Sequence, residues 1–191
     1  MENRMRLSVV PIVLVAAALA APVLADAPAD TVTAVWAPQK LSFTFLGFTA
    51  KYSCDGLQDK MRRVLLKLGA QAKDLSVRQK GCAGGLGRPS AFPGVYVQMN
   101  VLQPVTDKTD AAAVRVNAHW QTVDLTASRD PVDAAGDCEL TEQIKEQVLP
   151  KFTTRNVEYR STCIPNQLTV GGTQLKAEVL IADKPATAAA K

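Results

Sequence analysis

Residues 53–82 read SCDGLQDKMRRVLLKLGAQAKDLSVRQKGC and hold a cysteine near each end. Their apolar side chains recur at the three- and four-residue spacing of one helix face, at Leu57, Met61, Val64, Leu65 and Leu68. We therefore predict an amphipathic helix over 55–68, which Ser53 or Asp55 can cap and Gly69 can end. A short strand over 75–80 leads from this helix to the second cysteine.

The same order returns in the second half of the chain. Asp137-Cys138-Glu139-Leu140 opens a helix predicted over 138–152, whose last turn Pro150 disturbs, and a strand over 157–163 again ends in a cysteine. Cys54 and Cys82 are 28 positions apart, and Cys138 and Cys163 are 25 apart. The match indicates an internal duplication, although coincidence in a short chain of helices and strands would give the same order.

Alternating apolar and polar residues predict the remaining strands. They lie at 40–53, with a bulge beside Gly47, at 95–101, at 114–121 and at 173–181. Gly171-Gly172 is predicted to form a tight hairpin turn between 168–170 and the last of these strands. The polar segment 103–113 joins two of these strands, so we expect them to form an antiparallel pair. The predicted fold class is α+β: two β-α-β-β units, at 40–125 and 126–181, share one antiparallel sheet layered with two helices.

The repeat also selects a disulfide pattern. Four cysteines allow three pairings, and the repeated order favours Cys54 with Cys82 and Cys138 with Cys163. Each bridge would join the start of a helix to the end of the following strand. A redox thiol and a four-cysteine zinc site are the alternatives, but both usually need two cysteines close in sequence, which this chain lacks.

The N-terminus has the pattern of a secretory signal peptide over 1–25. Arg4 and Arg6 precede an uncharged apolar run that ends in Val23-Leu24-Ala25. A retained membrane anchor is the alternative, although Pro11 and Pro22 interrupt the run. Cleavage would leave 166 of the 191 residues, with a net charge of +3. We expect an N-terminal segment at 26–39, a disordered tail at 182–191, and a periplasmic or secreted protein without stable membrane insertion.

The glycine-rich stretch after the first unit's short strand is a candidate anion-binding loop. Bare backbone amides can hold an anion between two basic side chains, and the residues concerned are Lys80, Gly84, Gly85, Gly87 and Arg88. No Gly-Lys-Ser/Thr sequence is present and no helix follows the glycines directly, so the stretch matches neither nucleotide-binding motif. A flexible connection held by a disulfide is the alternative interpretation.

Two of the predicted strands carry polar residues at every second position. If these strands pair, the polar side chains share one candidate binding face for a glycan or a peptide: Tyr96, Gln98, Asn100, Arg115, Asn117, His119 and Gln121. The solvated side of an antiparallel sheet would show the same pattern. Catalysis by His119, the single histidine, would also need a nucleophile and an orienting acid such as Asp124, and no serine lies in a nucleophile-elbow motif.

Several short motifs resemble exported proteins of proteobacteria for which no activity is established. They are Tyr52-Ser53-Cys54-Asp55-Gly56-Leu57, Leu66-Lys67-Leu68-Gly69-Ala70, Lys80-Gly81-Cys82, Phe92-Pro93-Gly94-Val95 and Val101-Leu102-Gln103-Pro104. The resemblance covers about half of the chain, mainly the first unit. It implies a Gram-negative periplasmic location and assigns no functional residue.

We expect a non-enzymatic binding or accessory module with an unknown ligand or an exported protein as its partner. The alternatives are a small periplasmic hydrolase using His119, and an inhibitor or interaction partner that presents the glycine-rich loop. The positive charge is mild, and a nucleic-acid binder would need a clustered basic face, so the sequence does not indicate one. It indicates no metal site and no cofactor, and no catalytic residue is assigned.

Overall fold

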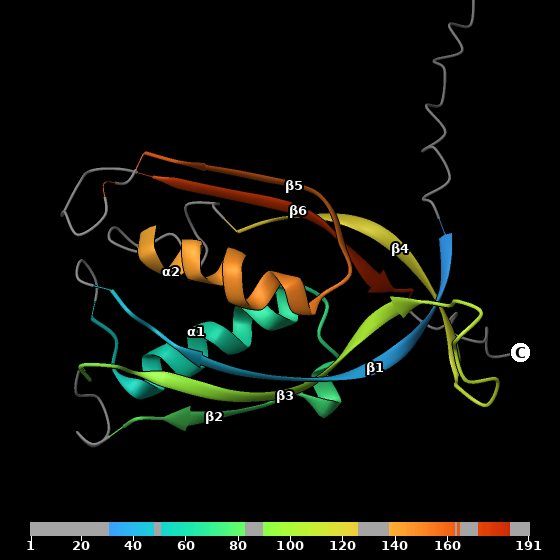
Figure 1. The fold of residues 1–191 in the computed structure, drawn as a ribbon, viewed down its shortest axis with the longest axis horizontal. Coiled ribbons are helices and arrows are strands. Elements are labelled where there is room, and N and C mark those ends of the chain that lie inside the picture. Colours follow the sequence, from blue (N-terminus) through green and yellow to red (C-terminus); the bar gives the residue numbers. More distant parts are fainter. Residues whose placement is uncertain are drawn as a thin grey trace, which may run out of the picture.

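The computed structural model describes residues 31–47, 51–82, 90–125, 138–162, 164 and 172–183. They form a six-stranded antiparallel sheet in the order β2-β3-β1-β4-β6-β5, with two helical segments on one side of it (Figure 1). The fold class is therefore α+β, as predicted. The elements are β1 (Thr31–Thr44), α1 (Cys54–Lys67), η1 (Ala72–Asp74), β2 (Ser76–Lys80), β3 (Gly94–Pro104), β4 (Arg115–Asp124), α2 (Cys138–Gln143), η2 (Ile144–Val148), η3 (Leu149–Lys151), β5 (Thr154–Ser161) and β6 (Thr173–Ala182).

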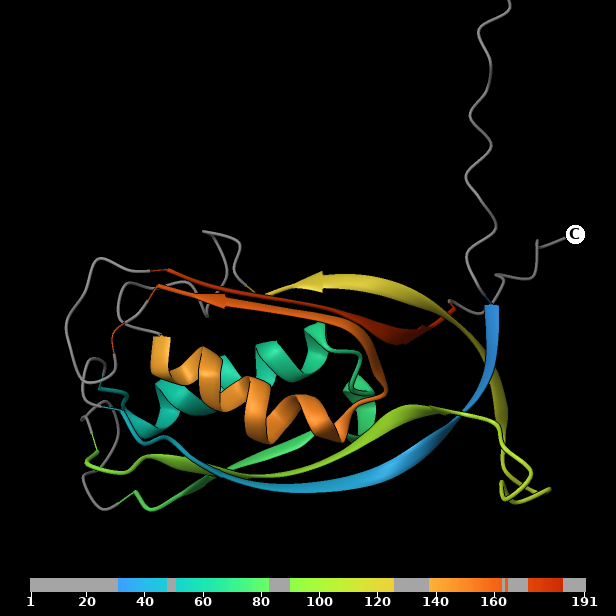
Figure 2. The same ribbon diagram turned by 45° about the horizontal axis from the view of Figure 1, so that its top comes forward.

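The sheet is strongly curved and wraps around the helices. β2, β3 and β1 lie on one side of α1 and α2, and β4, β6 and β5 lie on the other (Figures 1 and 2). One hydrophobic core fills the space between the two halves of the sheet. Both helices and both halves contribute fully buried side chains, among them Phe43, Leu65, Ile144, Leu175 and Val179. The part of the concave face that packs against α1 and α2 is thus apolar.

The sheet consists of two units with the same topology. β1-α1-β2-β3 and β4-α2-β5-β6 each follow the order β-α-β-β. Within each unit, the third strand lies between the first and the second, and the two first strands, β1 and β4, meet at the centre of the sheet. The repeated order β-α-β-β places β4 with the second half of the chain, whereas the predicted boundary at 125/126 groups β4 with the first unit; β4 itself pairs with β1 and with β6.

A short sequence motif and its strand pairing both recur in the two units. Val32-Thr33-Ala34-Val35-Trp36 in β1 and Val116-Asn117-Ala118-His119-Trp120 in β4 are 84 positions apart, as are Cys54 and Cys138. Trp36 pairs with Leu102 in the first unit, and Trp120 pairs with Leu180 in the second. Thr33 pairs with Asn117, its own equivalent. The pairing of β1 with β4 is therefore symmetric about Thr33 and Asn117. A two-fold axis relating the two units would pass between these two residues.

The equivalent residues of the two units gather on the convex face around that pair. Ala34, Leu102, Ala118 and Leu180 are at most 3% exposed, and Trp36 and Trp120 pack against them. They occupy even-numbered positions, whereas the concave core uses odd-numbered positions of the same strands, such as Leu41 and Val123. This small second cluster joins the two halves of the sheet on the outside, where β1 and β4 share only a short run of pairs.

The predicted first strand differs from the observed one at both ends. β1 begins at Thr31 and ends at Thr44, so the strand predicted over 40–53 with a bulge beside Gly47 is wrong in its bounds. Most of the predicted N-terminal segment 26–39 belongs to the sheet. Pro38 is tolerated within this strand because β4 pairs only with Thr31–Val35, which leaves β3 as the one neighbour at Pro38.

The predicted direct pairing of the strands now called β3 and β4 is also wrong. β1 lies between them and pairs with both. The segment that joins β3 to β4 therefore crosses the end of β1 and does not form a hairpin. As a result, the predicted binding residues of β3 and those of β4 are not on neighbouring strands.

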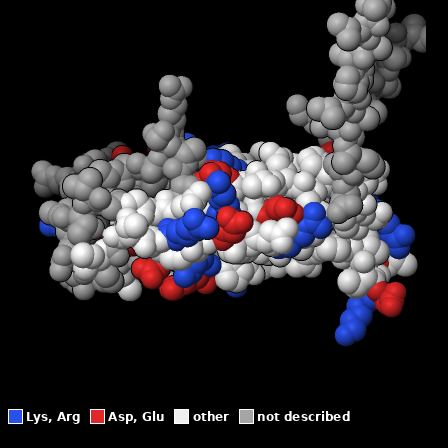
Figure 3. Space-filling view, turned by 90° about the horizontal axis from the view of Figure 1, so that it is seen from above, with Lys and Arg blue, Asp and Glu red and all other residues white. Residues whose placement is uncertain are grey.

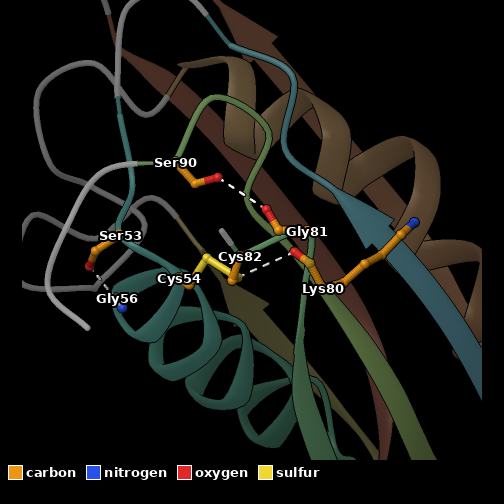
Figure 4. Close-up of a disulfide and its surroundings, with 7 residues drawn as sticks. All are labelled: Ser53, Cys54, Gly56, Lys80, Gly81, Cys82 and Ser90. Atoms are coloured by element: carbon orange, nitrogen blue, oxygen red, sulfur yellow. Dashed lines mark hydrogen bonds between the residues drawn. A yellow bond between two sulfur atoms is a disulfide. The ribbon is translucent and has the colours of Figure 1, made fainter. Parts of the chain in front are cut away.

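The first helix and its disulfide confirm the prediction. Ser53 caps α1 by accepting a hydrogen bond from Gly56 N at 3.2 Å, and Gly69 follows the helix with a φ of +94°. Cys54, the first residue of α1, is bonded to Cys82, just after β2 (Figure 4). The bridge fixes the start of α1 to the end of the strand that follows it.

The second helical segment is less regular. α2 ends at Gln143, and the chain continues as one π-turn segment, where Leu149 N donates to Ile144 O, and a short 3-10 segment. Pro150 accounts for this change because it lacks an N–H donor and its ring clashes with the carbonyl group four residues before it. The predicted helix over 138–152 is thus present as a continuous helical stretch with altered winding.

Some predictions fall on residues that the structure does not describe. Cys138 is in a disulfide, but its predicted partner Cys163 lies outside the described residues, so that pairing stays a prediction. The signal peptide, the turn at Gly171 with 168–170, and the tail from residue 184 onwards also lie outside them. Residue 182, predicted to begin the tail, is the last residue of β6.

Candidate functional site

The convex face of the first unit carries two rows of polar side chains. Residues directly opposite in antiparallel strands point to the same side of a sheet. Lys40 of β1, Gln98 of β3 and Ser76 of β2 therefore form one row, and Ser42, Tyr96 and Arg78 form the next. Their sequence neighbours Leu41, Val97 and Val77 belong to the concave core.

These two rows line an open groove of about 380 Å³. Its residues are Lys40, Leu41, Ser42, Ser76, Arg78, Tyr96, Val97 and Gln98. Tyr96, near the start of the middle strand β3, is 54% exposed, which is unusual for a large aromatic side chain. The groove therefore has an aromatic floor with hydrogen-bonding groups and cations around it.

Three basic side chains surround Tyr96. Lys80 donates to Ser42 Oγ at 2.7 Å and to Thr44 Oγ1 at 3.0 Å, and its Nζ lies 5.4 Å from the centre of the Tyr96 ring. Lys40 and Arg78 form no hydrogen bond or ion pair within the part of the chain that the structure describes. None of the described residues that line the groove carries a carboxylate. Among the described residues that line this groove, positive charge is thus present without negative charge.

The second unit has a hollow at the equivalent place on its own convex face. This hollow, of about 560 Å³, is lined by Asp124, Arg160, Ser161, Thr162, Gly172, Thr173 and Gln174. Arg160 pairs with Gln174 across β5 and β6, as Arg78 pairs with Tyr96 across β2 and β3. Asp124 stands 84 positions after Lys40, so an acid replaces a base at the equivalent position.

Charges on this second face are balanced. Lys176 lies 3.5 Å from Asp124, and Arg155 forms an ion pair with Glu178. The hydrogen bond from Arg155 lowers the pKa of the Glu178 carboxyl, which keeps the acid ionised. Figure 3, which views the β4–β6–β5 side of the molecule, shows basic and acidic side chains interspersed on it. The excess of positive charge therefore distinguishes the first groove from the second.

The free edge of β2, beside the groove, is partly covered by side chains of α1. Two side chains of α1 occupy backbone carbonyls along this edge: Gln58 donates to Val77 O at 2.7 Å, and Arg62 donates to Leu75 O at 3.4 Å. Unpaired strand edges attract other strands unless they are covered in this way. A ligand of the groove would therefore contact side chains. The occupied carbonyls at the edge of β2 disfavour the addition of a peptide strand there.

The predicted binding face does not exist as one surface. Tyr96 and Gln98 line the groove, and Asn100, one row further on, donates to Asp74 at 2.9 Å. The other predicted members lie in β4 and point to the opposite, concave side of the sheet: Arg115, Asn117, His119 and Gln121. The insertion of β1 between β3 and β4 causes this separation.

Of the five residues of the candidate anion loop, the structure describes one, Lys80. Lys80 stands at the end of β2 and reaches the groove, whereas Gly84, Gly85, Gly87 and Arg88 lie outside the described residues. The pattern of alternation did not single out Lys40, Ser42, Ser76 and Arg78. These residues are polar and stand at even-numbered positions, as do Tyr96 and Gln98. A comparison of the even-numbered positions in all the predicted strands would have found them.

His119 forms a contact with an acid other than the expected one. Its Nδ1 lies 2.6 Å from Asp183 Oδ1, just beyond the end of β6. Asp124, the acid proposed from the sequence, lies beside Lys176 instead. The His119–Asp183 pair is about one third exposed, and it stands on the concave side of the sheet, away from the groove.

A buried lysine interrupts the apolar face of α1. Lys60 is 6% exposed, and its Nζ donates to the Tyr52 hydroxyl at 3.3 Å. Burial, and to a smaller extent the charge of Arg63, lower the pKa of the Lys60 amine to about 8. Ile144, which stands 84 positions later, is apolar and fully buried. An aliphatic side chain thus suits the equivalent position in the second unit.

Lys60→Met is expected to raise the melting temperature at pH 7 by roughly 2–5 °C, because it removes a buried charge. The unfolded chain holds this proton up to its ordinary pKa of 10.5, and the folded protein releases it near 8. The wild-type protein should therefore gain stability as the pH rises from about 8 to 10.5, and the variant should lose this gain. Thermal denaturation across this range checks both effects, with exposed Lys73→Met as the control; an unchanged pH profile in Lys60→Met would contradict the assignment.

Within the described residues, no three His, Cys, Asp or Glu side chains gather as they would around a metal ion. No helix in that part of the chain is long and apolar enough to cross a membrane. No family model, curated protein or solved structure matches this chain.

Proposed function

We propose that this protein is an exported, non-enzymatic binding module whose anionic ligand occupies the convex groove of the first unit. The observation that carries the proposal is the presence of Lys40, Arg78 and Lys80 around exposed Tyr96, with no carboxylate among the described groove residues. Cations gathered without counter-charges repel one another, and an anion relieves this repulsion. The guanidinium of Arg78, which forms no ion pair with the described residues, suits a carboxylate or phosphate group.

The location of the protein is part of the proposal. A signal peptide over 1–25 would export the chain to the periplasm, where disulfides form and persist. The Cys54–Cys82 bridge supports an oxidising compartment. It also supports a structural role for the cysteines, since both sulfur atoms are held in the bond and neither is available as a thiol.

An internal duplication accounts for the two grooves. The shared topology, the 84-residue spacing of the Val-x-Ala-x-Trp motif and the self-pairing of Thr33 with Asn117 support it. Under this proposal, one unit keeps a cationic groove, and the other has acquired Asp124 in place of the equivalent Lys40. The second groove thus provides an internal control for the first.

The test compares matched arginines of the two grooves. Inorganic tripolyphosphate titrated by calorimetry at low ionic strength should bind the wild-type protein, and Arg78→Gln should weaken binding about fivefold, which corresponds to about 1 kcal/mol for one exposed ion pair. Arg160→Gln should change the affinity less than twofold, and added salt should weaken binding by screening. Equal effects of the two substitutions, or no binding, would show that the first groove is not an anion site.

A second candidate function rests on the His119–Asp183 contact, because a carboxylate at 2.6 Å can orient an imidazole as a general base. A small hydrolase using His119 would cleave at least one compound in a panel of esters, glycosides and phosphates. It would lose that activity in His119→Ala and keep it in Arg78→Gln. Absence of hydrolysis in the wild-type protein would remove this candidate.

A further inference from the structure

The groove offers more than positive charge. Tyr96 provides an exposed aromatic surface, and Ser42, Ser76 and Gln98 provide neutral hydrogen-bonding groups beside it. Lys80 lies against the Tyr96 ring and bonds to Ser42, so the ring is held in place from one side. The aromatic surface and the amide group would contribute nothing to the binding of a bare inorganic anion. The ligand that satisfies the whole groove carries an apolar ring face and hydroxyl groups as well as negative charge.

The spacing of the cations sets the length of the ligand. Lys40 and Arg78 stand two strands and one row apart, which puts their Cα atoms about 12 Å from each other at ordinary strand spacing and rise. Tyr96 lies between them in the middle strand. The volume of about 380 Å³ is in the range of small-molecule sites. A ligand of about two ring units would place one ring on Tyr96 and reach a cation on each side.

We propose that the anionic ligand of this groove is an acidic carbohydrate, a sugar chain bearing carboxylate or phosphate groups. One face of a sugar ring would stack on Tyr96, its acidic groups would contact Lys40 and Arg78, and its hydroxyl groups would bond to Gln98 and the two serines. This proposal rests on the proposed function and narrows it. A peptide is disfavoured because side chains of α1 cover the adjacent edge of β2.

The test uses three probes on residues 26–191, the chain expected after cleavage of the signal peptide: tetragalacturonate, neutral maltotetraose and inorganic tripolyphosphate. Calorimetry should show tetragalacturonate binding and no binding of maltotetraose. Tyr96→Ala should weaken tetragalacturonate about tenfold through loss of the stacking surface and change tripolyphosphate less than twofold. Tyr96→Phe, which keeps the ring, should retain the affinity for tetragalacturonate. Gln174→Ala, at the equivalent position of the second groove, should have no effect on either ligand.

The outcomes separate the two proposals. If tripolyphosphate binds and tetragalacturonate does not, or if Tyr96→Ala weakens both ligands equally, the carbohydrate proposal is overturned and the anion groove stands. If neither charged probe binds, both proposals are overturned. Because Tyr96 is exposed, Tyr96→Ala is expected to keep the wild-type melting temperature, and a Tyr96→Phe variant that loses the sugar as Tyr96→Ala does would also overturn the stacking role.

Discussion

Replacement of both Cys54 and Cys82 by alanine is expected to lower the free energy of unfolding by about 3–4 kcal/mol, the chain-entropy value for closing a loop of this length. The bridge spans 28 positions and ties the first residue of α1 to the end of β2. Without it, the unfolded chain gains conformational freedom, and the start of α1 is held by its Ser53 cap and by the packing of its apolar side chains. Guanidinium denaturation of the oxidised proteins, followed by circular dichroism, measures the difference.

The double variant avoids the free thiol that a single substitution would leave. Reduction of the wild-type protein serves as the second measurement, and it should destabilise at least as much as the double substitution, because Cys138 is also in a disulfide. A loss below about 1 kcal/mol in the double variant would show that the bridge contributes little beyond the packing of α1.

Leu65→Ala in α1 and Leu149→Ala in the equivalent place of η3 are each expected to cost about 2–5 kcal/mol, the range for a buried leucine. Leu65 is fully buried and Leu149 is 4% exposed, in the same core between the two halves of the sheet. Since that core includes side chains from both units, each substitution should shift one common unfolding transition. Loss of either leucine should therefore destabilise the whole protein.

The two tryptophans provide unit-specific probes for this experiment. Trp36 lies in β1 and Trp120 in β4, so Trp36→Phe leaves a reporter in the second unit and Trp120→Phe leaves one in the first. In both backgrounds, the fluorescence transition should coincide with the one seen by circular dichroism. Two separate transitions, each moved only by the leucine substitution in its own unit, would contradict the shared core.

The sequence contains enough local information to predict the helices and most strands. α1 is marked by an apolar stripe, a serine cap and a following glycine, all of which act within a few residues of one another. The start of β1 lies outside the predicted strand because Pro38, which cannot donate a ladder hydrogen bond, is typical of a segment that precedes a strand. What makes them a strand is pairing with β3, more than 50 residues away.

The groove could not be predicted in this way. Its floor and walls come from three strands, and Lys40, Arg78 and Tyr96 become neighbours only through the register of β1 and β2 against β3. The sequence suggested β3 beside β4, because chain neighbours often pair. The observed order places β1 between them, which is the arrangement that lets two units of the same topology meet at their first strands.

The central claim is that the convex face of the first unit, and not that of the second, binds an anion. The most direct measurement is a titration of the isotope-labelled protein with tripolyphosphate, followed by amide chemical shifts. We predict shifts concentrated at Lys40, Ser42, Arg78, Tyr96 and Gln98, with little change at Arg160 and Gln174. Shifts centred on β5 and β6, around His119 and Asp183, or spread equally over both units would contradict the account.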